Sequence, residues 1–257
     1  MDSVILGDGP LGWAIAAAAS ERGDRARLVG RPAGTSHDPV GLAGADVAFE
    51  VSRGDAVARN VASLVEAGVR RIVIGTTAWD ADRARVQDVL VRRGAAAVAA
   101  PNLSLGMALF GRLVDAAVAL YGGLAAFDPY VVEWHRRGKA DRPSGTARAL
   151  AARIVDAHPR VTRVADSTSG PSAPDTLEVI GVRAGANPGS HLVGFDAPGE
   201  SIELRCTARD RTAYAAGALA AADWLRAARR APGLHTFDEI VDDLLLADST
   251  PGIAMAS

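Results

Sequence analysis

The chain has 257 residues, of which 49% are hydrophobic, so it can bury the core of one large or two modest domains without disulfides. Its 28 basic and 30 acidic side chains nearly cancel and leave a net charge of -2. This balance argues against nucleic acid or a membrane surface as a partner and favours a small molecule. The single cysteine, Cys206, cannot form an internal disulfide, and no neighbouring cysteine or histidine suggests a metal site.

The sequence shows no pattern typical of a targeting signal or of a membrane-spanning segment. The chain opens on a strand-like apolar run after two residues, and no stretch of about 18 apolar residues follows. A single cysteine fits a reducing compartment. We therefore expect a cytoplasmic protein without a membrane-spanning helix.

Short apolar runs alternate with amphipathic stretches through the first third of the sequence. Runs typical of buried parallel strands occur at 4–6, 27–29, 47–49, 72–74 and 97–99. Helices are expected at 11–20, 57–66 and 82–92, each with a glycine near its end. This alternation predicts a doubly wound, Rossmann-like α/β domain.

The character of the sequence changes after Pro101 and Asn102, where a second domain is expected to begin. A long apolar helix at 105–121 and a strand ending at His135 come first. The elements expected after them are a helix at 144–157, strands at 177–183, 190–195 and 202–207, and helices at 212–228 and 237–246. Because glycine turns join the three alternating runs, they predict an antiparallel block.

The glycine-rich segment at 7–12 follows the first strand directly and opens a helix. In that position the first glycine permits a tight turn, the second lets the backbone approach a pyrophosphate, and the third allows close packing of helix and strand. Backbone N–H groups at the start of the helix favour an anion, and proline suits the first turn. The alternative is a purely structural turn. The candidate cofactor contacts here are Gly7, Gly9, Pro10, Leu11 and Gly12.

The end of the second strand bears on the choice of nicotinamide cofactor. An acidic residue there would bind the ribose of NAD, but the sequence has Arg31 instead. An arginine can pair with the extra phosphate of NADP, so NADPH is favoured, with NADH possible. The alternative is that Arg31 is a solvated surface residue. Further candidate cofactor contacts, at the ends of the later strands, are Gly75, Thr76, Thr77, Pro101 and Asn102.

The segment 133–146 is the most informative in the chain. It leaves a strand, passes His135 and Lys139, and ends on Ser144, Gly145 and Thr146 where a helix begins. Backbone N–H groups, hydroxyls and the helix dipole at that point predict a carboxylate site. The histidine and the lysine would supply proton donors beside it. The alternative is a partly buried histidine at a strand end followed by a solvated basic loop.

These motifs, in this order, resemble the 4-hydroxy-tetrahydrodipicolinate reductase family of the diaminopimelate route to lysine. The most specific part is the run KADRPSGT at 139–146. The resemblance extends through nearly the whole chain, at 7–12, 74–77, 100–106, 133–146, 183–191, 199–204 and 211–225.

The resemblance implies a dinucleotide-binding domain at 1–103 and 213–257 and a smaller α+β domain with a mixed sheet at 104–212. The smaller domain would form a homotetramer. The reaction implied is hydride transfer from C4 of the nicotinamide to C4 of a cyclic dicarboxylate, followed by loss of water.

The resemblance also implies roles for particular residues. His135 and Lys139 fall on the two positions implicated as the acid that protonates the substrate. The implied or candidate substrate ligands are Arg136, Ser144, Gly145, Thr146 and Arg211.

Several positions depart from the family pattern. In the second domain, Arg136 and Gly138 replace two histidines, and Arg205 replaces a third. In the cofactor domain, Ala78 stands where glycine is usual, and residues 50–52 read Glu-Val-Ser in place of Asp-Phe-Thr/Ser. Two alternatives therefore stay open: a divergent enzyme that reduces another cyclic imine or enamine acid, and a non-catalytic NADP-binding protein. Retention of both proton donors and of the carboxylate site argues against the second.

Overall fold

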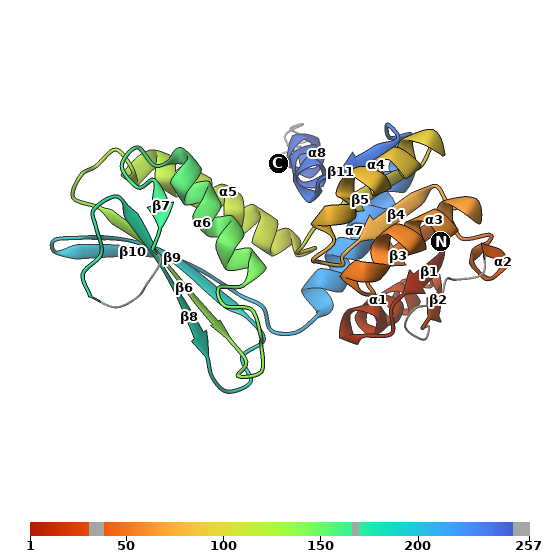
Figure 1. Cartoon of the computed structure of the whole chain (residues 1–257), viewed down its shortest axis with the longest axis horizontal. Helices are drawn as coiled ribbons and strands as arrows, with labels where there is room; N and C mark the ends of the chain where they lie inside the picture. The colour runs from red at the N-terminus through yellow and green to blue at the C-terminus, as the bar shows by residue number, and fades with distance from the viewer. Residues whose placement is uncertain (31–38, 166–169, 249–257) are drawn as a thin grey trace, which may run out of the picture. The chain divides into compact units, whose positions relative to one another are not determined.

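The structure, a computed structural model, describes residues 1–30, 39–165 and 170–248, so Arg31 lies outside the described residues. The chain divides into two compact units, one formed by Met1–Leu105 with Arg211–Ser257 and the other by Gly106–Asp210 (Figure 1). Each unit has its own sheet and its own hydrophobic core. No helix within the described ranges is long and apolar enough to span a bilayer.

The first unit is built on a six-stranded parallel sheet in the order β11-β5-β4-β3-β1-β2. The strands are β1 (Asp2–Leu6), β2 (Arg25–Val29), β3 (Val47–Glu50), β4 (Arg71–Ile74), β5 (Ala96–Ala99) and β11 (Gly233–His235). The five strands expected from the apolar runs are confirmed, while β11 was missed because three residues carry too little pattern. Since β2 and β3 lie on opposite sides of β1, the strand order reverses between β1 and β3, and ligands of such sheets bind at this reversal.

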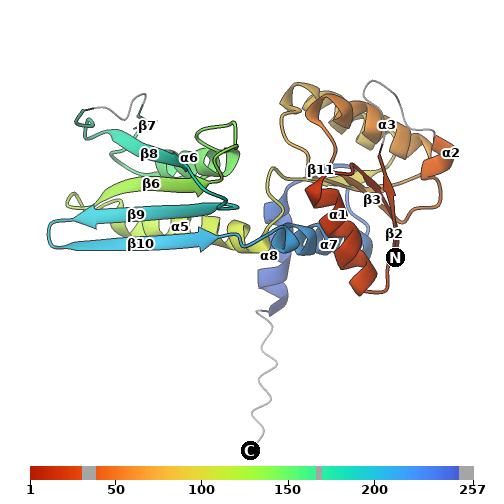
Figure 2. The ribbon, with the colours of Figure 1, turned by 90° about the horizontal axis from the view of Figure 1, so that it is seen from below.

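Helices cover both faces of this sheet (Figures 1 and 2). The helices α3 (Val57–Glu66) and α4 (Arg83–Arg92) bury their apolar side chains on one face, whereas α1 (Pro10–Glu21) packs beside α7 (Thr212–Ala227) on the other. Burial on both faces explains why these strands read as continuous apolar runs. The remaining helical segments are α2 (Pro39–Leu42), η1 (Gly54–Ala56), η2 (Asp80–Asp82) and α8 (Phe237–Asp248), of which α8 contacts α7.

The second unit has a five-stranded mixed sheet in the order β10-β9-β6-β8-β7, which confirms the expected α+β class. The strands are β6 (Asp128–His135), β7 (Arg163–Val164), β8 (Thr176–Arg183), β9 (Ser190–Ala197) and β10 (Glu200–Thr207). The expected antiparallel block is correct for β9 and β10 but wrong for β8, which pairs with β6 in parallel. The reason is that α6 (Gly145–Ala157) acts as a crossover helix between β6 and β8 and returns the chain to the same end of the sheet.

One face of the mixed sheet packs against α5 (Leu105–Tyr121) and α6 (Figures 1 and 2). Because side chains alternate along a strand, Val131, Glu133 and His135 of β6 share this inner face. The register places Glu133 opposite His191 of β9, and His135 opposite Arg183 of β8. The inner face therefore changes from an apolar core to a buried polar cluster toward the carboxyl end of β6.

Ala78, after β4, has a backbone φ of 60°, the left-handed region that side chains with a Cβ disfavour. Glycine, which the resemblance implies at this position, would adopt this conformation without strain. Ala78→Gly is expected to raise the free energy of unfolding by about 1 kcal/mol, because relief of roughly 1–2 kcal/mol of backbone strain is partly offset by the entropy of the unfolded glycine. Urea unfolding measures the change.

A matched control is Ala84→Gly, an exposed alanine with helical backbone in α4. That substitution should lower the free energy of unfolding by about 1 kcal/mol. Equal losses in both variants would contradict the assignment of strain to Ala78.

Candidate functional site

The glycine turn lies at the carboxyl end of β1, beside the strand reversal. Gly7 has φ 125°, and a Cβ there would stand 2.5 Å from the Val51 carbonyl oxygen after β3. A Cβ on Gly12 would stand 2.0 Å from the Gly7 oxygen, so helix and strand pack as closely as glycine allows. Gly9 is the N-cap of α1, has no side-chain cap, and a Cβ there would meet nothing within 4 Å. The turn thus presents the start of a helix at an open surface, as an anion site requires.

An acidic group lies at the end of β2, where the sequence analysis expected none. A Cβ built on Gly30 would stand 2.8 Å from Oδ2 of Asp8, so the Asp8 carboxylate lies over this glycine. The signal was present in the glycine turn itself, since Asp8 lies between its first two glycines.

The Glu50 side chain connects the carboxyl ends of β3 and β4 through hydrogen bonds. It is fully buried, and its carboxylate accepts hydrogen bonds from Asn60 Nδ2 at 2.7 Å, from Thr76 Oγ1 at 2.5 Å and from the Ser52 hydroxyl. Burial raises the pKa of Glu50, although these three hydrogen bonds oppose the shift. The Thr76 hydroxyl therefore points into the protein, which leaves its backbone as the part able to meet a ligand.

Gly75, directly after β4, is surrounded by side chains from the start of α1 and from the segments that follow β3 and β5. A Cβ there would stand 2.9 Å from the Leu103 side chain, 3.2 Å from that of Val51 and 3.6 Å from that of Leu11. Thr77, two residues on, is exposed. The candidate cofactor residues of the glycine turn and of the β4 end thus lie side by side.

The remaining candidates of the first unit lie at the end of β5. Pro101 is exposed, and the Asn102 side-chain oxygen accepts a hydrogen bond from the Ser104 backbone at 2.9 Å. Asn102 therefore holds the turn that leads into α5.

A buried ion pair dominates the second unit's polar cluster. Glu133 is fully buried, and its Oε1 accepts from Arg183 at 2.7 Å and from the Ser144 backbone N–H at 2.9 Å. Arg183 also donates to the Asp141 carbonyl oxygen. Burial alone would raise the pKa of Glu133, but the hydrogen bonds from Ser144 and Arg183 outweigh it and lower that pKa. The pair therefore ties two points of the segment 136–144 to the sheet.

Two histidines lie beside this pair. The Nε2 atom of His135 is 3.2 Å from Glu133 Oε2, and its ring meets the ring of His191 edge to face at 5.3 Å between centroids. A Cβ on Gly189 would stand 2.9 Å from the His135 ring, so only glycine fits there. Burial lowers the pKa of His135 against the opposing Glu133 charge, and burial together with His135 lowers the pKa of His191 to about 4. Both rings are therefore neutral near pH 7.

Lys139 lies on the turn after β6, with its Nζ 2.6 Å from Asp141 Oδ1. It is the only lysine in the sequence, and the other 27 of the 28 lysine and arginine residues are arginines. Arginine holds its proton throughout the physiological range, whereas lysine can release one. The sequence itself therefore distinguishes Lys139 from the other cations, independently of the motif at 139–146.

The start of α6 contains the three residues from which the sequence predicts a carboxylate site. Ser144 is the N-cap, and its hydroxyl accepts from the Ala147 N–H at 3.1 Å, so its own proton remains available to donate. Gly145 and Thr146 are the first residues of the helix and are half-buried. Burial raises the pKa of the Asp141 carboxyl, but Lys139 and the Gly145 backbone outweigh burial and lower it. The Gly145 backbone, one of the three expected donors, thus favours a charged carboxylate beside it.

The two arginines among the candidate ligands belong to different units. Arg136 is exposed on the turn after β6. Arg211 belongs to the first unit and stacks over the Tyr214 ring at 5.3 Å, at the start of α7. Within the second unit, the structure brings His135, Lys139 and the start of α6 together.

Sequence comparisons give consistent matches over most of the chain. A sequence model described as "Dihydrodipicolinate reductase, C-terminus" matches residues 106–241. The 4-hydroxy-tetrahydrodipicolinate reductase of Archaeoglobus fulgidus is 34% identical over 210 residues, which is 80% of this chain and 79% of that protein. The enzyme of the same name from Wolinella succinogenes is 35% identical over 199 residues, or 76% of this chain and 75% of its own length.

Solved structures agree on the fold. A dipicolinate-bound dihydrodipicolinate reductase from Paenisporosarcina sp. TG-14 superposes with a TM-score of 0.69 at 18% identity, over 92% of this chain and 97% of that one. A probable dehydrogenase from Thermotoga maritima gives a TM-score of 0.51 at 11% identity, over 97% of this chain and 95% of its own.

The raised pKa of Glu50 predicts a pH dependence of stability. Because the folded state holds this proton more tightly than the unfolded chain, its contribution is fully present below the ordinary carboxyl pKa of about 4.3 and is lost as pH rises through the raised folded-state value. The loss has a slope of up to about 1.4 kcal/mol per pH unit. Glu50→Gln should remove that slope, as urea unfolding at a series of pH values measures. Parallel stability curves for the two proteins would contradict it.

Proposed function

The chain belongs to the 4-hydroxy-tetrahydrodipicolinate reductase family, and we propose on this basis that it reduces 4-hydroxy-tetrahydrodipicolinate to tetrahydrodipicolinate with a nicotinamide cofactor, in the diaminopimelate route to lysine. The observation within the chain that carries the proposal is its only lysine, Lys139, held next to a carboxylate site at a helix start. A reductase of a dicarboxylate needs both an anion site and a group that gives up a proton.

The residues of the first unit fit the cofactor. Gly9 leaves open space at the uncapped start of α1, and Gly7 and Gly12 allow the backbone approach that a pyrophosphate requires. The exposed Thr77 and the backbone after β4 would face the nicotinamide end, on a loop that Glu50 holds in place. The bound cofactor supplies the hydride, and the protein's part is to hold and orient it.

The second unit holds the substrate. One carboxylate accepts from the N–H groups of Gly145 and Thr146, with the Ser144 hydroxyl donating to it. The exposed Arg136 offers a second cation for the other carboxylate. Fixing the ring at both ends keeps its reacting carbon in one orientation, which lowers the entropic cost of hydride transfer.

Of the two candidate acids, Lys139 is the one we assign. His135 is only 8% exposed, and its Nε2 lies 3.2 Å from Glu133 Oε2, so this ring is buried against a protein carboxylate. The Lys139 side chain is 25% exposed, and its Nζ offers N–H groups to a ligand. His135 has a structural role, because its backbone oxygen accepts a hydrogen bond from the Ala184 N–H at the ends of β6 and β8.

NADPH remains the proposed cofactor, on the strength of Arg31 after β2. The Asp8 carboxylate over Gly30 acts in the opposite sense, because an acid at this place pairs with ribose hydroxyls and repels a phosphate. Use of NADH as well is therefore expected. Biosynthetic reduction of this kind draws on the cytoplasmic pool of reduced cofactor, so we place the enzyme in the cytoplasm.

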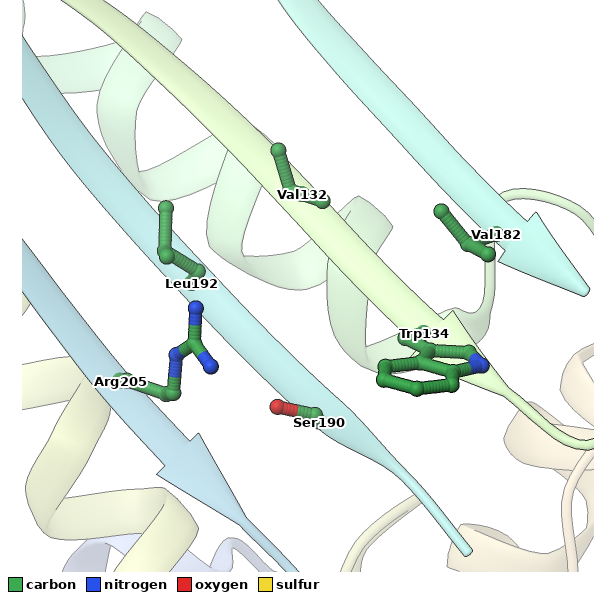
Figure 3. A pocket seen from close by; sticks show the side chains of 6 residues that line it. All are labelled: Val132, Trp134, Val182, Ser190, Leu192 and Arg205. Carbon is green, nitrogen blue, oxygen red and sulfur yellow. The ribbon is translucent and has the colours of Figure 1, made fainter. Parts of the chain in front are cut away.

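We propose that the chain forms a homotetramer and that the outer face of the mixed sheet is an interface between its copies. That face, opposite α5 and α6, contains a hollow of about 210 Å³ lined by Val132, Trp134, Val182, Ser190, Leu192 and Arg205 (Figure 3). Trp134 is 46% exposed and Val182 is 38% exposed. A large apolar patch of this kind favours burial against the same face of another copy.

The direct test mixes purified protein with NADPH or NADH and enzymatically generated 4-hydroxy-tetrahydrodipicolinate, and follows the loss of nicotinamide absorbance. Turnover is expected with both cofactors and should be faster with NADPH. Absence of turnover, with cofactor binding demonstrated by fluorescence, would contradict the proposed substrate and favour a divergent enzyme for another cyclic imine acid.

Substitutions of Lys139 test its role as the acid. Lys139→Ala and Lys139→Arg are both expected to lower kcat by about 10²–10⁴-fold, because neither side chain releases a proton at neutral pH. The affinity for NADPH should change less than twofold in both, as fluorescence titration measures. If Lys139→Arg keeps most of kcat, the residue acts only as a positive charge and the assignment is wrong.

A further inference from the structure

A cavity of about 570 Å³ in the first unit is lined by arginines, and we call it the arginine cavity. It lies where α7 ends and where β4 and β5 begin, because the last residues of α7 and the first residues of both strands belong to its lining. Among the described residues that form this lining, none is acidic. Its cationic residues are Arg70, Arg71, Arg226, Arg229 and Arg230.

The arginine cavity is separate from the glycine turn and from the other candidate cofactor residues. Those residues follow the carboxyl ends of β1, β4 and β5, whereas the cavity lies at the amino ends of β4 and β5. Arg71 begins β4 and Gly75 follows it, so the length of the strand, roughly 13 Å, separates them. A ligand in the cavity would therefore occupy the opposite edge of the parallel sheet.

Two of these arginines also stabilise the ends of helices. Arg70 donates through Nη1 to the Val65 carbonyl oxygen at 2.8 Å, near the end of α3. Arg71 donates through Nε to the Leu225 carbonyl oxygen at 3.1 Å, near the end of α7. A guanidinium has five N–H donors, so these bonds hold each group in place and leave most of its donors available.

The positive charge of the cavity exceeds the negative charge beside it. Arg230 pairs with Asp243 at 3.1 Å. Arg226 lies 3.7 Å from Asp223, a carboxylate that is also paired at 2.7 Å with an arginine of the α1 C-terminus.

The other three arginines, Arg70, Arg71 and Arg229, have no carboxylate partner in the part of the chain that the structure describes. This concentration of charge contrasts with the net charge of -2 of the whole chain. A cleft lined by charges of one sign raises the local concentration of counter-ions. The cavity therefore favours an anion with more than one charge.

We infer that the arginine cavity binds a small molecule that carries at least two phosphate groups. Guanidinium groups pair with phosphate through two parallel hydrogen bonds. Each phosphate group carries about 1.5–2 negative charges at neutral pH, so two of them match the three unpaired arginines and Arg226. A dicarboxylate would leave part of this positive charge unmatched.

The shape of the cavity also favours a small molecule over an acidic protein. Its volume lies within the range of small-molecule sites, about 300–1,000 Å³. The exposed Ala227, Ala228 and Pro232 form an apolar part of the lining, against which the organic part of a phosphorylated ligand can pack. A ligand held there would connect α7 to the start of β4 and stabilise the folded protein.

Calorimetric titration of the full chain with pyrophosphate tests the inference, with NADPH at saturation so that the glycine turn is occupied. Wild-type protein is expected to bind one equivalent, with an affinity that falls as NaCl is added. The double variant Arg226→Gln with Arg229→Gln should bind at least about 10-fold more weakly, because two charge-assisted contacts are lost. Both side chains are exposed, so the variant should keep the wild-type circular dichroism spectrum.

The matched control is Arg59→Gln with Arg85→Gln, which removes two exposed arginines of α3 and α4 outside the cavity. This control should bind pyrophosphate as the wild type does, and succinate should bind to the wild type at least about 10-fold more weakly than pyrophosphate.

Four results would overturn the inference: no binding of pyrophosphate to the wild type, unchanged binding in the cavity variant, an equal loss in the control, or tighter binding of succinate or a hexaglutamate peptide than of pyrophosphate. No readout measures turnover, so a failure here is distinct from a failure of the proposed reaction.

Discussion

The second unit depends on one buried ion pair, between Glu133 of β6 and Arg183 of β8. Removing two charges from water is costly, and here hydrogen bonds to Ser144 and to the Asp141 carbonyl offset that cost. The same bonds fix the turn that carries Lys139 and the start of α6. Gly181, whose Cβ would stand 3.0 Å from both Glu133 and Arg142, leaves the space that this arrangement needs.

Much of the fold could be predicted from the sequence, because strands buried on both faces and amphipathic helices leave distinct periodicities. The parallel sheet of the first unit follows from its apolar runs. The position of β8 could not be predicted in the same way, since its alternating pattern suits a parallel or an antiparallel neighbour equally. The choice depends on α6, which carries the chain back across the sheet before β8 begins.

The candidate site was predictable where its residues are contiguous, as in the glycine turn and in 133–146. The Glu133–Arg183–His191 cluster was not, because it forms only when β6 pairs with β8 and β9, which lie more than 40 residues later in the chain. Likewise, Thr76 reads as a cofactor contact until the structure shows its hydroxyl on Glu50. Two signals were present in the sequence and unused: Asp8 within the glycine turn, and Lys139 as the sole lysine.

That single lysine also offers the most direct measurement of the central claim, that the Glu133–Arg183 pair holds Lys139 at a carboxylate site. Protein labelled with ¹³C-lysine should give one Cε signal, which a titration with pyridine-2,6-dicarboxylate should shift until it saturates. Arg183→Met, which breaks the pair, should require at least about 10-fold more dicarboxylate, with NADPH affinity unchanged. A Lys139 signal that does not respond, or that responds equally in both proteins, would contradict the account.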